Sequence, residues 1–203
     1  MQELGVTATL LLAACASAPQ TRYYSLDDFA ARQGSLCAES GSTKTQVTVK
    51  PFNVLPPFNT TQIVYRPPNL PQTIGFYASH QWATLPDRML AQATADYLCR
   101  AGINAKLSAL STNSPTEALT VSADVSELLE VDTPTGPSGQ VALTIRAHGQ
   151  NGALLFERQL WGRVLAQERT VYSVVKAIDQ ALQAALDEAA PKIRRLMQVS
   201  VNQ

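Results

Sequence analysis

Histidine, cysteine and charged residues are scarce in this sequence. Its 203 residues include two histidines and three cysteines, and charged residues make up 16% of the chain. Sixteen lysines and arginines balance sixteen aspartates and glutamates. Because a nucleic-acid-binding protein needs a basic face and a polybasic membrane anchor needs clustered cations, this balance argues against both. We therefore expect no nucleic-acid partner.

The sequence also lacks the short motifs that mark common catalytic and metal sites. It contains no Gly-x-Ser-x-Gly elbow, phosphate-binding glycine loop, His-Glu-x-x-His helix or clustered zinc ligands. We therefore predict a protein that is not an enzyme and uses no metal or cofactor. One alternative stays open: an envelope hydrolase in which Ser79 or Ser173 works with His80. A histidine among aromatic residues, as His80 is, is more typical of packing than of catalysis.

Apolar runs are short, and none reaches the roughly eighteen residues that a transmembrane helix needs. The apolar residues 4–14 instead end in Leu12-Ala13-Ala14-Cys15. This order matches the bacterial lipobox, in which small residues fit the signal peptidase and the cysteine thiol receives a diacylglycerol. We predict a signal peptide over 1–14, an acylated Cys15 and a lipidated tether over 15–22.

Two further features bear on this targeting segment. Ala16, rather than aspartate, follows the cysteine, and the bacterial sorting rule then indicates the outer membrane. Glu3 stands where signal peptides carry basic residues, which we attribute to a start site set too late in the chain. The alternative is a buried N-terminal helix with a stray cysteine.

Two cysteines remain for the folded body once Cys15 is acylated. The periplasm is oxidising, so we predict a disulfide between Cys37 and Cys99. Two free thiols are the alternative. Such a bridge would stabilise the fold without implying any activity.

Hydrophobic periodicity indicates one α+β domain over 23–198. Alternation with a period of two predicts strands, and apolar residues spaced three and four apart predict helices. The expected strands lie at 22–26, 46–50, 61–66, 74–82, 103–107 and across an antiparallel meander over 117–166; the expected helices lie at about 85–101 and 171–197. The predicted fold is sandwich-like, a mostly antiparallel sheet with two long helices packed on one face.

Two local signals refine the helix predictions. Residues 84–87 have the spacing of a capping box at the start of the first helix. Pro191 is expected to kink or break the second helix, because proline lacks the backbone N–H that a helix interior needs.

Aromatic residues concentrate in the N-terminal half of the chain. One interpretation is a surface that contacts a partner; the other is an ordinary core. The residues predicted for the partner surface are Tyr65, Arg66, Phe76, Tyr77, His80 and Trp82.

Several of these segments resemble the ABC-type transport auxiliary lipoprotein family. The similar segments are Tyr23-Tyr24-Ser25-Leu26, Ile63-Val64-Tyr65-Arg66, residues 76–86 and Met89-Leu90, within an element order that matches over 23–197. The resemblance implies a non-enzymatic lipoprotein anchored in the outer membrane and facing the periplasm. Its implied role is to dock a mammalian-cell-entry (MCE) protein that works with an inner-membrane transporter in lipid transport between the membranes.

Two points stay open beside this implied role. Sheet edges pair readily, so copies of the chain could associate in a homo-oligomer. The alternative function is a lipid-binding carrier lipoprotein that itself shelters an acyl chain, for which a sizeable apolar cavity is required.

Overall fold

The computed structural model describes residues 20–26, 46–108 and 117–201, so the predicted signal peptide, Cys15 and Cys37 lie outside the described residues. The strands are β1 (Arg22–Tyr24), β2 (Gln46–Val49), β3 (Asn53–Val54), β4 (Gln62–Arg66), β5 (Gly75–Trp82), β6 (Ala105–Leu107), β7 (Glu117–Thr133), β8 (Gly136–Gly149) and β9 (Leu154–Leu165); the helices are α1 (Pro86–Arg100) and α2 (Val171–Val201). Neither described helix combines the length and the apolar character that crossing a membrane requires.

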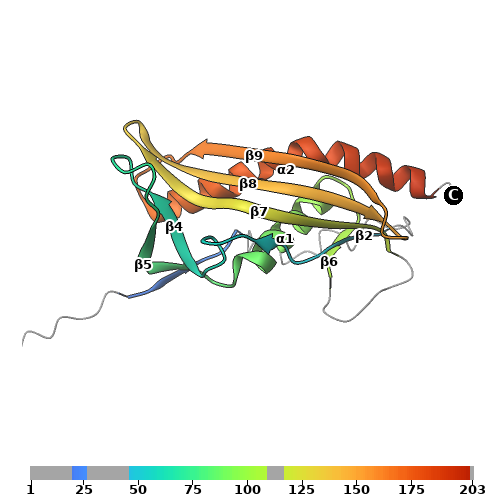
Figure 1. The fold of residues 1–203 in the computed structure, drawn as a ribbon, viewed down its shortest axis with the longest axis horizontal. Helices are drawn as coiled ribbons and strands as arrows, with labels where there is room; N and C mark the ends of the chain where they lie inside the picture. The colour runs from blue at the N-terminus through green and yellow to red at the C-terminus, as the bar shows by residue number, and fades with distance from the viewer. Residues whose placement is uncertain (1–19, 27–45, 109–116, 202–203) are drawn as a thin grey trace, which may run out of the picture.

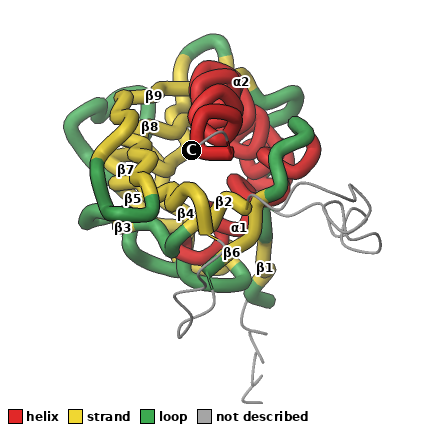
Figure 2. Tube along the Cα trace, turned by 90° about the vertical axis from the view of Figure 1, so that its right-hand side faces the viewer, coloured by secondary structure: helices red, strands yellow, loops and turns green. Residues whose placement is uncertain are grey.

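All the strands belong to one mixed sheet, against which both helices pack (Figure 1). The predicted α+β class is confirmed. Figure 2, turned by 90°, shows α2 beside β8 and β9, and α1 beside β2 and β6.

The antiparallel meander of β7, β8 and β9 forms the longest part of the sheet. β7 and β8 pair from Leu119 opposite Gly149 to Thr133 opposite Gly136, and β8 pairs with β9 along most of its length. A hairpin at residues 150–153 joins β8 to β9, and Gly152 there has a φ of 76°, a left-handed conformation that favours glycine. The predicted meander over 117–166 is confirmed.

The N-terminal strands are short and add parallel pairs to the sheet. β2, β3 and β4 each run parallel to β7 along the edge that β8 leaves free. β6 runs parallel to β2, and β1 runs parallel to β5 at the end of the strand order. The parallel pairing of β2 and β6 needs a long crossover connection, and α1 lies within that connection.

Each helix differs from its sequence-based prediction at one place, the start of α1 and Pro191 in α2. The capping box predicted at 84–87 is wrong, because the N-cap residue is Leu85 and no side chain caps it. α2 continues through Pro191 to Val201, so the predicted break is also wrong, and the predicted kink stays a prediction. Pro191 is exposed while Ala190 and Ile193 are buried, and packing of the buried side offsets the backbone hydrogen bond that proline cannot donate.

α2 lies unusually close to the meander at two glycines. A Cβ on Gly162 would lie 2.0 Å from the carbonyl oxygen of Ala181, and a Cβ on Gly139 would lie 2.2 Å from the backbone nitrogen of Ile178. Both distances are far shorter than a van der Waals contact, so any other residue at these positions would push the helix away. The glycines therefore set the distance between α2 and the sheet.

Candidate functional site

An aromatic cluster lies at the end of the sheet formed by β1, β5 and β4. The rings of Tyr65 and Tyr77 lie 4.9 Å apart between centroids. His80 packs 5.5 Å from Tyr77 in an edge-on arrangement and 5.6 Å from Tyr24. We call these four residues the aromatic cluster. Gly75 makes room for it, because a Cβ there would lie 2.3 Å from Cζ of Tyr65.

Hydrogen bonds tie the aromatic cluster to the sheet at two points. The Tyr77 hydroxyl donates to Oε2 of Glu130 on β7 at 2.8 Å, and Glu130 is only 6% exposed. The Tyr24 hydroxyl lies 2.8 Å from Nδ1 of His80. Burial raises the pKa of the Glu130 carboxyl, and burial together with Glu130 raises the pKa of Tyr77. The pair thus consists of a donor and an acceptor that are both held away from water.

His80 has the surroundings of a packing residue rather than of a catalytic base. Desolvation, helped by the nearby charge of Arg22, lowers the pKa of His80 and favours its neutral form. Ser173 is buried at the start of α2, where its hydroxyl accepts a hydrogen bond from the backbone N–H of Glu168. Ser79 precedes His80 in β5, whose pairing with β4 is irregular here, and no hydrogen bond joins the two side chains in the described part of the chain. The described residues give the hydrolase alternative no serine–histidine contact.

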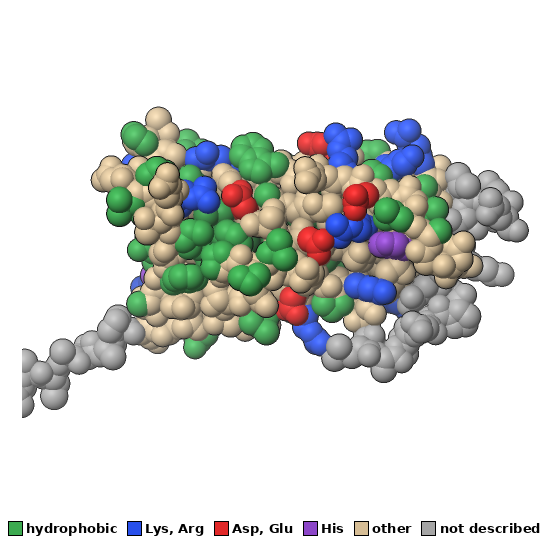
Figure 3. All heavy atoms as spheres, in the orientation of Figure 1, with side chains coloured by type: hydrophobic (Ala, Val, Ile, Leu, Met, Phe, Trp, Pro, Cys, Tyr) green, Lys and Arg blue, Asp and Glu red, His purple; other side chains and the backbone are tan. Residues whose placement is uncertain are grey.

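The predicted partner surface is only partly at the surface. Phe76 is 42% exposed, and Tyr65, Tyr77 and His80 are half-buried. Arg66 lies 3.6 Å from the carboxylate of Glu127. Figure 3 shows hydrophobic side chains gathered over the end of the sheet where β4 meets β7.

Trp82 does not belong to this surface. It is 2% exposed and lies in the core, so its place in the predicted surface is wrong. Alternation along a strand separates two faces, but it does not say which face a helix or loop covers.

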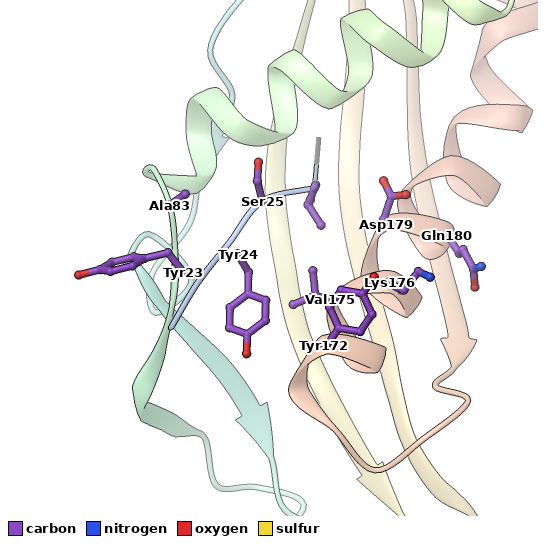
Figure 4. A pocket seen from close by; sticks show the side chains of 10 residues that line it. Tyr23, Tyr24, Ser25, Ala83, Tyr172, Val175, Lys176, Asp179 and Gln180 are labelled. Carbon is purple, nitrogen blue, oxygen red and sulfur yellow. The ribbon is translucent and has the colours of Figure 1, made fainter. Parts of the chain in front are cut away.

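A cavity of about 620 Å³ lies beside the aromatic cluster, between β1 and α2 (Figure 4). Its lining residues come from both elements and the segments next to them: Tyr23, Tyr24, Ser25, Leu26, Ala83, Tyr172, Val175, Lys176, Asp179 and Gln180. Figure 4 shows Tyr24 and Tyr172 approaching the space from opposite sides. The Lys176 ammonium lies 5.3 Å from the centre of the Tyr172 ring, a cation–π contact.

The cavity combines apolar and charged walls. Tyr24, Leu26 and Val175 supply aromatic and aliphatic surface, while Lys176 and Asp179 supply charge. Its volume falls in the range of about 300–1,000 Å³ found for small-molecule sites, and its mixed lining suits an amphiphile. Among the described residues, no three histidine, cysteine or acidic side chains are grouped to hold a metal ion.

Sequence reasoning missed this cavity because its walls lie far apart in the chain. Tyr172 and Lys176 are four residues apart and share a helix face, which was the one available signal. Nothing in the periodicity of α2, however, places that face beside β1.

Cys99 on α1 is disulfide-bonded. Its partner is not among the described residues, so the specific pairing with Cys37 stays a prediction.

The chain resembles known proteins both in sequence family and in fold. The family model for the ABC-type transport auxiliary lipoprotein component matches residues 24–190. The crystal structure of an uncharacterized protein is 15% identical to this chain, with a TM-score of 0.65, and the match covers 86% of this chain and 99% of the other. A Xanthomonas campestris protein is also 15% identical, with a TM-score of 0.62 and coverage of 78% and 90%. No curated protein matches the sequence.

Proposed function

The chain belongs to the ABC-type transport auxiliary lipoprotein family, and from this premise we propose that it is a non-enzymatic docking component of an envelope lipid-transport system. In this proposal it binds an MCE-domain protein that works with an inner-membrane ABC transporter. The observation that carries the proposal is the family match, which spans nearly all of the folded body.

The lipid anchor supplies the location. A lipobox ending at Cys15 precedes the matched region. Acyl chains contribute about 0.8 kcal/mol per buried methylene, so a triacylated cysteine would hold the protein on a membrane. We place this anchor in the outer membrane, with the domain facing the periplasm.

The partner would bind at the aromatic end of the sheet. Phe76 is exposed there, and β1 is a terminal strand of the sheet order, so backbone groups along its outer side are available for strand addition. Tyr65 and Arg66 lie on β4, the next strand but one. Aromatic and arginine side chains are the residue types that dominate binding energy in protein interfaces. β9 pairs only with β8 in the described sheet, and its other side is the edge that we propose for self-association into a homo-oligomer.

In-cell crosslinking followed by affinity purification and mass spectrometry tests the proposal. We expect the native chain to recover an MCE-domain protein and the Cys15→Ala variant to lose it. Phe76→Ser should weaken the crosslink, and Leu55→Ser, at a similarly exposed position after β3, is the matched control. If the native chain recovers no MCE-domain protein, the docking role is wrong.

The cavity between β1 and α2 favours a second candidate function, a carrier that shelters an acyl chain. Native mass spectrometry of the purified protein would then detect bound phospholipid. Ala83→Trp fills the cavity from an exposed position and should abolish that binding, whereas Ala153→Trp in the β8–β9 hairpin should leave it intact. Absence of phospholipid from the native protein would rule out the carrier.

A further inference from the structure

We propose that the end of the molecule formed by the start of β1 and the first turns of α2 lies against the phospholipid headgroups of the membrane that holds the anchor. The contacting residues are Arg22, Tyr23, Tyr172 and Lys176, which we call the headgroup surface. The proposal rests on the lipid anchor of the proposed function and adds a second, non-covalent contact with the bilayer.

The two tyrosines are the first observation. Tyr23 is 66% exposed and Tyr172 is 63% exposed, the highest values among the large apolar side chains that stand exposed in the described chain. They come from opposite ends of the sequence and border the same cavity, Tyr172 facing it and the Tyr23 ring pointing outward from β1 (Figure 4). Tyrosine is enriched where a membrane meets water, because its ring is apolar and its hydroxyl forms hydrogen bonds.

Cations flank the tyrosines. Lys176 is exposed, and its ammonium lies 5.3 Å from the centre of the Tyr172 ring. Arg22 is exposed beside Tyr23. Long cationic side chains lay their methylenes on apolar surface and extend their charge to phosphate groups. The first turn of α2 contains no acidic residue, and Thr170 caps it with a neutral hydroxyl that accepts from the Ser173 N–H, so the positive dipole end adds to the cations here.

The position of the tether identifies the membrane as the occupant. Only residues 16–21 separate Cys15 from Arg22, and a fully extended chain of that length spans about 24 Å. Figure 1 shows the start of β1 and the start of α2 at the same end of the molecule, and the C-terminus of α2 at the other. An acylated Cys15 therefore keeps the headgroup surface next to the bilayer.

Fluorescence quenching tests which end of the molecule meets the lipid. The acylated full chain is inserted into vesicles of phosphatidylethanolamine and phosphatidylglycerol that include phospholipid brominated near the headgroup end of its acyl chains. Tyr172→Trp places a reporter on the headgroup surface, and Leu154→Trp places one at an exposed position at the start of β9. We expect brominated lipid to quench the added fluorescence of the first variant and not of the second. Equal quenching of both, or of neither, would overturn the proposal.

A binding measurement without the acyl anchor gives an independent test. In the Cys15→Ala chain, we expect Lys176→Gln to weaken sedimentation with the same vesicles about fivefold, and Tyr23→Ser with Tyr172→Ser to weaken it further. Leu154→Ser with Leu155→Ser is the control, and all variants keep the apolar residues 4–14. If the native acylated chain does not associate with membranes, the lipid anchor itself is wrong. If it associates but the headgroup variants bind as the control does, only this inference fails.

Discussion

The two halves of the sheet are stabilised in different ways. The half made of β7, β8, β9 and α2 has long antiparallel strands, alternating apolar residues and a helix seated on glycines. The half made of β1 to β6 and α1 has short strands, several of them parallel, and an aromatic cluster held by partly buried hydrogen bonds. The first half is held by close packing between strands and helix, and the second by contacts among aromatic rings. The cavity lies where the two halves meet, between β1 and α2, and exposed aromatic residues occur in both halves.

The same contrast appears in two carboxylates of β7. Hydrogen bonds from Asn53 and Arg146 lower the pKa of Asp124, which lies on the outer face among paired charges. Burial raises the pKa of Glu130, six residues along the strand, beside Tyr77. Figure 3 shows charged side chains gathered farther along the meander than the hydrophobic ones. β7 therefore connects a solvent-exposed region of paired charges with the partly buried aromatic cluster.

Gly162→Ala should reduce the stability of the protein most, because it disrupts close packing in the half formed by β7, β8, β9 and α2. The new Cβ would collide with the carbonyl oxygen of Ala181, so α2 must move off the sheet. We expect the free energy of unfolding to fall by about 3 kcal/mol, as in other overpacked cores. Chemical denaturation measures it.

Gly152→Ala is the control for that variant. Gly152, unlike Gly162, has a left-handed φ of 76°, and nothing lies within 4 Å of an added Cβ. Only backbone strain should count there, at about 1 kcal/mol. If the two variants lose the same free energy of unfolding, the close approach of α2 is not the reason that position 162 requires glycine.

Tyr77→Phe should have the second largest effect on stability, because it removes a hydrogen bond that holds the aromatic cluster. The variant keeps the ring but leaves the buried Glu130 carboxyl without this donor. An unsatisfied buried group costs about 2 kcal/mol. Tyr65→Phe keeps the ring contact with Tyr77 and is the control, with a smaller expected loss.

Glu130→Gln should remove a pH dependence rather than a fixed amount of stability. Because the folded-state pKa of Glu130 is raised above its ordinary value of 4.5, the folded protein holds this proton more tightly than the unfolded chain. The stability that Glu130 contributes to the folded protein is therefore fully present below pH 4.5, and it is lost as pH rises through the raised pKa. Unfolding curves across this range should slope downward for the native chain and less so for Glu130→Gln. An unchanged slope would mean that another group titrates.

Arg146→Met should have the smallest effect of the series. Arg146 pairs with Asp124 at 2.7 Å and with Glu157 at 2.5 Å on the outer face of the sheet. Water and salt screen such exposed pairs, so we expect a slight decrease in stability that vanishes in high salt. A large or salt-independent loss of stability would mean that these ion pairs are shielded from water, as the Tyr77–Glu130 hydrogen bond is.

The amino-acid sequence was informative wherever the signal is local. The alternation in 117–133 and 136–149 and the apolar stripe of 86–100 predicted their elements within a few residues. Local reasoning failed where long-range packing outweighs a local preference. Pro191 stays inside α2 because packing along the buried side of the helix holds it in place. Trp82 is buried, although the sequence pattern of its strand did not indicate which face the rest of the fold covers.

By itself the sequence determined both helices, every described strand but β3, the lipobox and the family motifs, because each depends on neighbouring residues or on a short pattern. Only the tertiary structure decided that Tyr77 meets Glu130, 53 residues away, and that β1 and α2 enclose one cavity. Those contacts depend on strand order and register, which follow from how the whole core is packed rather than from any one segment. The candidate site lies where such distant segments meet, so it could be located only from the folded chain.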